Sequence, residues 1–246
     1  ELYCMVKTLN DFAELEKNRK GYLTKDLRQM AARIRTSMFE EQANADELLK
    51  RVEIREPKRK PIVSETFEVI GQALVHRQRV RIVYYSENKK EETRRVVSPM
   101  RLNYYRNRWY LDAWCHERGA LRSFNIENIR YADIMQMGVK VVPMKTVEAE
   151  LDRYYGMYRS GDLQWARIRF AGAASKIASQ VIWHPDQMEL WLKDDLYELT
   201  IPYSGNSPEL VGDILRYGPA AKVVEPESLK EQVCEALKAS LKNYDK

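Results

Sequence analysis

Arginine and tyrosine side chains gather in one stretch of the chain, residues 76–131. This stretch holds 13 Lys and Arg, of which 11 are Arg, against 6 Asp and Glu. Arginine presents a planar hydrogen-bonding group to phosphate and stacks on flat rings. The rings could come from Tyr84, Tyr85, Tyr104, Tyr105 and Tyr110. Fixed cations beside aromatic rings could bind a flat, anionic ligand such as a nucleotide or a single-stranded nucleic acid.

A predicted hairpin from Arg108 to Ile129 lies at the centre of this stretch. The residues from Trp109 to Trp114 alternate as in a β-strand, and a second alternating run follows a short connection that contains Gly119. Two such runs around a short glycine-containing connection predict a β-hairpin. We expect the rings of Trp109 and Trp114 in the core. The hairpin also carries Arg108, Arg118 and Arg122.

The elements around the hairpin predict a small β-fold. A helical pattern begins at Ser64 and ends near residue 76. Strand-like segments follow at 80–85, 93–98, 102–105 and, after the hairpin, 129–137. One helix followed by about five short, closely spaced strands favours a small antiparallel barrel over a parallel sheet.

The C-terminal part predicts a separate α/β unit. Residues 146–163 have the pattern of a helical spacer. Beyond residue 164 we expect strands at 166–170, 188–192, 197–201 and 222–224, and helices at 173–182, 208–217 and 226–244. Their order, strand–helix–strand–strand–helix–strand, is that of a ferredoxin-like sandwich. The whole chain is therefore expected to be an α+β protein.

The first 60 residues have the pattern of a helical arm that serves as a linker or in dimerisation. Residues 24–50 carry an apolar stripe at helical spacing, and a charged segment at 51–61 contains Pro57 and Pro61. The sequence begins with Glu1 rather than Met, inside a helix-like pattern. We therefore expect a missing segment upstream.

The composition argues against several classes of protein. The chain has 246 residues, a formal net charge of +5, and three cysteines (Cys4, Cys115 and Cys234) that lie far apart without a CxxC pair. This predicts a reducing, cytoplasmic compartment without disulfides or a zinc site. No apolar run approaches the roughly 18 residues of a membrane span, and no signal peptide opens the sequence. No phosphate loop, GxSxG, HExxH or paired-carboxylate motif occurs, so we expect no enzyme, catalytic residue, cofactor or metal.

Several segments, in order, resemble the WYL-domain family. The family is named for the tripeptide that stands at Trp109-Tyr110-Leu111. The first strand, 79–86, the segment Arg95-Val96-Val97-Ser98-Pro99 and the segment Arg122-Ser123-Phe124 are similar to further family segments. The part from residue 164 onward is similar to the WYL C-terminal extension, called WCX.

The resemblance implies an Sm-like, SH3-type β-barrel over 61–145 that senses an effector, and a WCX domain over 164–246. It further implies a bacterial transcription regulator that works as a homodimer and binds operator double-stranded DNA through an upstream winged helix-turn-helix. The implied effector is a nucleic acid or a nucleotide, with single-stranded DNA favoured. The alternative is a stand-alone module that binds single-stranded RNA or DNA without recognising an operator.

The resemblance also implies which side chains touch the ligand. They are Tyr84, Ser86, Arg95 and Arg122, with Tyr110 nearby. Asn128 stands where the family often has Arg, so one cation is absent. In the extension, Arg167 and Arg169 flank a strand and could reach an effector or a partner subunit; a solvated strand face is the alternative.

Overall fold

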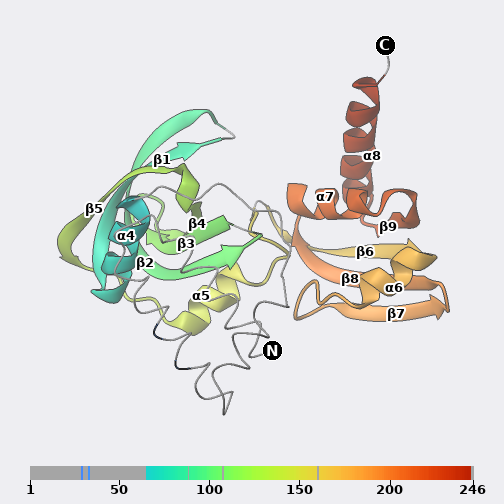
Figure 1. Ribbon diagram of the computed structural model, residues 1–246, viewed down its shortest axis with the longest axis horizontal. Coiled ribbons are helices and arrows are strands. Elements are labelled where there is room, and N and C mark those ends of the chain that lie inside the picture. Colours follow the sequence, from blue (N-terminus) through green and yellow to red (C-terminus); the bar gives the residue numbers. More distant parts are fainter. Residues whose placement is uncertain are drawn as a thin grey trace, which may run out of the picture.

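The computed structural model describes residues 65–244 apart from 88, 107 and 160, together with Gln29 and Arg33. The helical arm predicted for 1–60, apart from those two positions, and the predicted helix start at Ser64 lie outside the described residues. Two antiparallel sheets, each with its own helices, lie side by side along the long axis (Figure 1). This confirms the expected α+β class. None of the described helices is long and apolar enough to cross a membrane.

The first unit is built on a five-stranded sheet in the order β4-β3-β2-β1-β5. Its elements are α4 (Glu65–Val75), β1 (Gln78–Ser86), β2 (Glu91–Tyr105), β3 (Arg108–Cys115), β4 (Ala120–Asn125), the 3-10 turn η1 (Ile126–Asn128) and β5 (Ile129–Gly138). Among the described strands, the edges β4 and β5 do not pair with each other. The sheet is therefore open, and the closed barrel expected from the sequence is not formed.

One face of this sheet packs on α4 and is called the inner face below. Ile70 and Ala73 of α4 are fully buried against Val80 and Ile82 of β1, whereas Arg81 between them is exposed. The inner-face residues of β2, β3 and β4 in this core include Val97, Leu111, Ala113, Cys115 and Phe124. The alternation places every second side chain on the opposite, outer face.

Strand β2 is a single 15-residue strand, although the sequence predicted two strands on either side of Pro99. The pairing between β2 and β3 shifts register between Pro99 and Arg101. Proline has no N–H for the ladder, and an extra residue in one strand bends it without ending it. Beyond the shift, Arg101 pairs with Asp112 on the outer face.

Helix α5 (Met144–Leu151) packs on the outer face. Its Val147 and Leu151 are buried with Leu121, and Trp114 packs against this cluster. The prediction of a helix over 146–163 is wrong beyond Leu151, because the later backbone N–H groups bond to the second unit. The N–H of Tyr155 donates to the carbonyl of Pro202 at 2.9 Å.

The second unit has the order of elements that the sequence predicted. It contains β6 (Leu163–Ala171), α6 (Ala173–Ser179), β7 (Met188–Lys193), β8 (Leu196–Ser204), α7 (Pro208–Arg216), the 3-10 turn η2 (Gly218–Ala220), β9 (Ala221–Glu225) and α8 (Glu227–Lys242). The strand order in the sheet is β7-β8-β6-β9. Residues of β6, β8 and α7 such as Ile168, Leu199 and Leu210 form its core. Helix α8 projects away from the sheet (Figure 1).

Candidate nucleic-acid interface

Four of the predicted ligand residues lie on the inner face of the first sheet. Arg95 pairs with buried Ile82, and Arg122 pairs with buried Ala113. Directly paired residues of antiparallel strands point to the same face. Tyr84 and Ser86 follow Ile82 at alternate positions of β1 and share this face. These four residues, Tyr84, Ser86, Arg95 and Arg122, are called the inner-face patch below.

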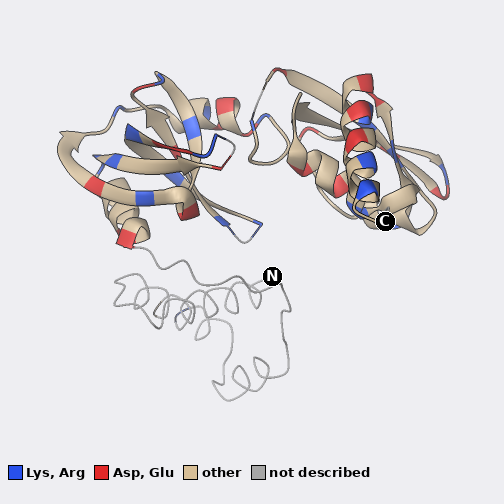
Figure 2. Cartoon of the chain, turned by 90° about the horizontal axis from the view of Figure 1, so that it is seen from above, with Lys and Arg blue, Asp and Glu red and all other residues tan. Residues whose placement is uncertain are grey.

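The two arginines of the patch keep their charge available. Arg122 is exposed, and no described residue forms a hydrogen bond or ion pair with it. Among the described residues, the half-buried Arg95 bonds only to the thiol of Cys115, with Nη1 4.0 Å from Sγ. Neither guanidinium forms an ion pair with a carboxylate of the described chain, so both can offer N–H groups to a phosphate. Figure 2 shows Lys and Arg spread over the strands of this unit.

Tyr84 supplies an aromatic ring beside these cations. Its half-buried ring meets Phe124 edge to face, with ring centres 5.2 Å apart and planes at 78°. Phe124 is on the same face as Arg122, two residues earlier on β4. Asn128 ends η1 next to Ile129, which pairs with Tyr84. At this neighbouring position the chain offers an amide instead of a cation.

Tyr110 lies on the outer face, away from the patch. It pairs with Asn103 on one side and Asn125 on the other. Burial and then the negative charge of Glu209 raise the pKa of Tyr110. Glu209 belongs to α7 of the second unit. The structure does not bring Tyr110 together with Arg95 and Arg122.

Arg167 and Arg169 lie on β6, on the face of the second sheet opposite its core. Arg169 Nε lies 2.6 Å from Glu198 Oε2, and Arg167 Nη2 lies 2.6 Å from Glu225 Oε1. Arg167 Nη1 is also 3.9 Å from Glu198 Oε1. Both charges are paired with acids of neighbouring strands, in contrast to the charge of Arg122.

A buried carboxylate on the outer face was not singled out by the sequence. Asp112, directly after the Trp-Tyr-Leu tripeptide, is 0% exposed. Its Oδ2 accepts from Arg101 Nε at 2.8 Å and from Asn103 Nδ2 at 2.6 Å, and its Oδ1 accepts from the Ser123 hydroxyl. Arg159 Nη1 lies 3.9 Å from Oδ1 and also donates to Ser123 Oγ. These five residues are called the Asp112 cluster below.

The Asp112 cluster continues into the segment between the two units. Arg101 donates through both Nη atoms to the carboxylate of Asp152, and this contact raises the pKa of Arg101 despite its burial. The Arg159 side chain is mostly buried, which lowers the pKa of its guanidinium, and its Nε donates to the carbonyl of Leu151 at 2.5 Å. In the sequence, an acidic residue in an alternating strand is expected to face solvent. Asp112 is buried because the segment between the two units covers the outer face, and that segment is distant in sequence.

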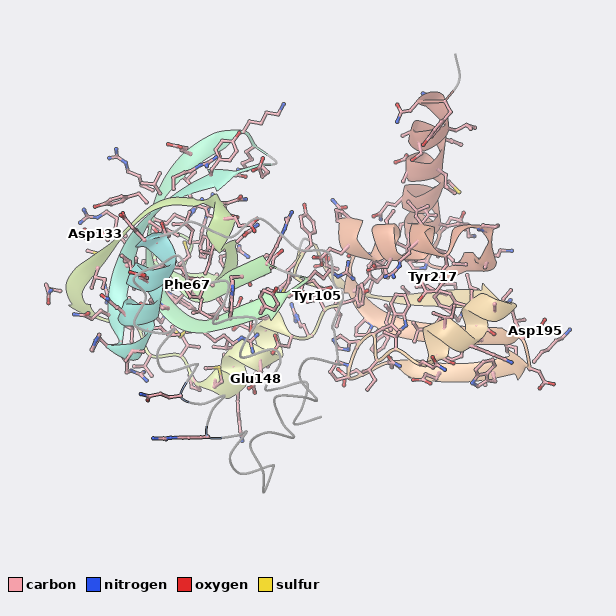
Figure 3. All side chains as sticks on the ribbon, viewed as in Figure 1. Phe67, Tyr105, Asp133, Glu148, Asp195 and Tyr217 are labelled. Carbon is pink, nitrogen blue, oxygen red and sulfur yellow. The ribbon has the colours of Figure 1, made fainter. Side chains whose placement is uncertain are left out.

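A second set of contacts joins the units directly. Arg106 Nη2 lies 2.5 Å from Asp213 Oδ2, which also accepts from the Tyr155 hydroxyl at 2.7 Å. Tyr105 lies between the two units in Figure 3. Burial, together with nearby Glu209, raises the pKa of Tyr105 to about 12. Within the described part of the chain, no group of three or more His, Cys, Asp or Glu is placed to hold a metal ion.

Comparison with protein families gives two matches along the chain. Residues 65–134 match the WYL domain, and residues 162–241 match the WCX domain. The first match contains the whole inner-face patch and the Asp112 cluster except for Arg159. The second contains Arg167 and Arg169.

Individual relatives are more distant. Protein PafC of Mycobacterium tuberculosis (strain CDC 1551 / Oshkosh) is 27% identical over 187 residues, which cover 75% of this chain and 56% of that protein. Protein PafC of Mycobacterium leprae (strain TN) is 25% identical over 181 residues, with coverages of 74% and 54%. The chain thus spans about half the length of these relatives.

Two solved structures are also similar. One is proteasome accessory factor B/C (PafBC) of Arthrobacter aurescens, with 20% identity, a TM-score of 0.35 and coverage of 83% of this chain and 30% of that chain. The other is a CRISPR Cas-related protein, with 15% identity, a TM-score of 0.47 and coverages of 73% and 51%.

Proposed function

Because the chain contains a WYL domain followed by a WCX domain, we propose that it is the effector-binding portion of a transcription regulator. The effector is a nucleic acid or nucleotide, with single-stranded DNA favoured, and it binds on the inner-face patch. In this proposal the regulator is a cytoplasmic homodimer, and a segment upstream of the chain binds operator DNA. The role is one of binding and not of catalysis.

One observation carries the proposal: the inner face holds two arginines without carboxylate partners in the described chain, beside a tyrosine ring. Arg95 lies on β2 and Arg122 on β4, the two strands that flank β3, and the ring of Tyr84 packs on Phe124, two residues after Arg122 on the same face. A phosphate binds a guanidinium through paired N–H groups, and a base stacks on a ring. Each stacked base contributes about 1–3 kcal/mol without strong sequence preference. A single strand presents both groups at once.

The two units also support an assignment of fold. The helix followed by five antiparallel strands supports an Sm-like, SH3-type fold with an open sheet for the first unit. The strand order β7-β8-β6-β9, with helices after β6 and β8, supports a ferredoxin-like sandwich for the second. We propose both assignments.

Fluorescence anisotropy tests the ligand. A labelled oligothymidylate of about 12 nucleotides, within the range that a small β-fold covers, is titrated with the chain at several salt concentrations. We expect affinity to fall steeply with salt, because each neutralised phosphate releases counterions. The double variant Arg95→Ala/Arg122→Ala should bind more weakly and lose about 2 from the salt slope, about 1 for each phosphate contact.

A matched control removes the same charge from the other face. Arg94 pairs with Val83 on the outer face, and Arg130 stacks on the outer-face ring of Tyr85 at 5.3 Å. The variant Arg94→Ala/Arg130→Ala should keep the parent's salt slope. Equal losses in the two double variants would show that net charge alone attracts the strand, and full binding by Arg95→Ala/Arg122→Ala would refute the patch.

A further inference from the structure

Strand β4 carries a residue of the inner-face patch on one face and a residue of the Asp112 cluster on the other. Arg122 points to the inner face and the next residue, Ser123, points to the outer face, where it pairs with Asp112. The Ser123 hydroxyl donates to Asp112 and accepts from Arg159. A displacement of β4 by a ligand at Arg122 therefore changes the position of a shared hydrogen-bonding group in the cluster.

The cluster has to respond to such a displacement as a unit. Asp112 has no exposed surface, and the Arg159 side chain is 13% exposed. Their partners cannot be replaced by bulk water without reorganising the site, because a buried charge that loses its partner is strongly disfavoured. Arg101 and Arg159 also bond to Asp152 and Leu151 respectively. Movement in the cluster thus reaches the start of the segment 151–159.

The same segment is bonded to the second unit. The Asp152 carbonyl lies 2.9 Å from His184 Nε2, and the N–H of Tyr155 donates to the Pro202 carbonyl at 2.9 Å. Glu209 Oε2 accepts from the N–H of Met157 at 2.7 Å. Segment 151–159 is therefore held from both sides, by the Asp112 cluster and by residues of the WCX domain.

We propose that Asp112 is a positioning residue that couples ligand binding on the inner-face patch to the segment 151–159, and through it to the WCX domain. The inference rests on the proposed function, since it describes how ligand binding at that same patch affects the rest of the chain. Tyr110 and the interdomain contacts lie on the outer face, so a ligand on the inner face acts on them through the sheet. Ser123 and Asp112 provide the described connection across it.

Hydrogen–deuterium exchange on the full chain tests the coupling. Exchange of the amides in 151–159 is measured with and without the oligothymidylate, and affinity is measured in parallel. In the parent, we expect the ligand to change exchange in this segment by at least about fivefold, the lower end of typical coupling between sites. A merely structural role for Asp112 predicts no change with ligand.

Two variants change the Asp112 cluster without changing the inner-face patch. Ser123→Ala removes the β4 hydroxyl but leaves Asp112 with Arg101 and Asn103, and Asp112→Asn keeps the shape but removes the charge. Both should still bind the oligothymidylate through Arg95 and Arg122, yet lose the response in 151–159. Ser240→Ala is the matched control, because Ser240 is exposed on α8 and its hydroxyl donates, within the described part of the chain, only to the Ala236 carbonyl.

The outcomes are distinguishable. A parent that binds the oligothymidylate without a response in 151–159 overturns the coupling and leaves the proposed function standing. A Ser123→Ala variant that responds as the parent does also overturns it. A parent that does not bind the oligothymidylate overturns the proposed function itself, and the inference with it.

Discussion

Among single residues, the partner of each arginine decides what that arginine can bind. Arg169 is held by the nearly buried Glu198, whose side chain is 8% exposed, at 2.6 Å. Arg122 meets no acid of the described chain and is exposed. A phosphate at Arg169 has to compete with an existing carboxylate, whereas a phosphate at Arg122 competes only with water. This contrast is why the proposed ligand site centres on the first sheet.

His116 shows how a residue beside the patch responds to pH. It follows Cys115 at the end of β3, and its Nε2 lies 2.9 Å from Ser98 Oγ. Burial, with a further contribution from Arg79, lowers the pKa of His116. The unfolded chain then binds this proton more tightly than the folded chain. The free energy of unfolding should therefore fall as pH drops below about 6.5, the ordinary histidine value, and His116 should contribute nothing well above it.

Urea denaturation of the parent and of His116→Gln at about pH 8 and about pH 5 measures this contribution. The parent should lose more stability than the variant between the two conditions. Every other ionisable side chain is the same in the two proteins, so the difference isolates His116. Equal losses would contradict a lowered pKa for this residue.

At the scale of elements, β3 depends on a polar contact in the middle of an apolar strand. Asp112 is flanked by buried Leu111 and Ala113, and two guanidiniums lie over it. Replacing one member of a buried charged set leaves the others without compensation. The cluster therefore favours the arrangement in which α5 and the following segment cover the outer face.

We expect Asp112→Ala to lower the free energy of unfolding by about 3–5 kcal/mol, because Arg101 and Arg159 lose their shared carboxylate. Asp133→Ala is the control: this half-exposed carboxylate on β5 lies 3.9 Å from Arg81, and such pairs contribute at most about 1 kcal/mol. Urea denaturation measures both. A loss for Asp112→Ala no larger than that for Asp133→Ala would mean that the cluster does not stabilise the fold.

The elements could be predicted from the sequence wherever the pattern was local. Alternation predicted the strands of both sheets, and helical spacing predicted α4, α7 and α8. That Tyr110 and Tyr84 lie on opposite faces of the sheet could not be predicted, because it depends on which residues pair across strands. For the same reason the pairing of Arg101 with Asp112 could not be predicted, because it follows from the register shift between Pro99 and Arg101. Helix α5 ends early because its successors bond to the second unit, which no local pattern reports.

At the scale of the whole molecule, the proposed ligand and the domain contacts lie on opposite faces of one sheet. Arg106, Tyr155 and Asp213 join the units on the outer side, and the segment 151–159 contacts both. In our proposal, a ligand on the inner face therefore acts on the WCX domain through the strands and the Asp112 cluster. The chain spans about half of its relatives' length, and within that part lie both the proposed ligand site and the proposed route to the WCX domain.

Photo-cross-linking determines where on the molecule a single strand binds. A single strand that carries 5-iodouracil is irradiated with the full chain, and the adducts are mapped by mass spectrometry. We predict the main adduct at Tyr84, although Tyr131 on the outer face is more accessible at 56% exposure. Adducts confined to Tyr131 or to the second unit would contradict binding of the strand on the inner-face patch.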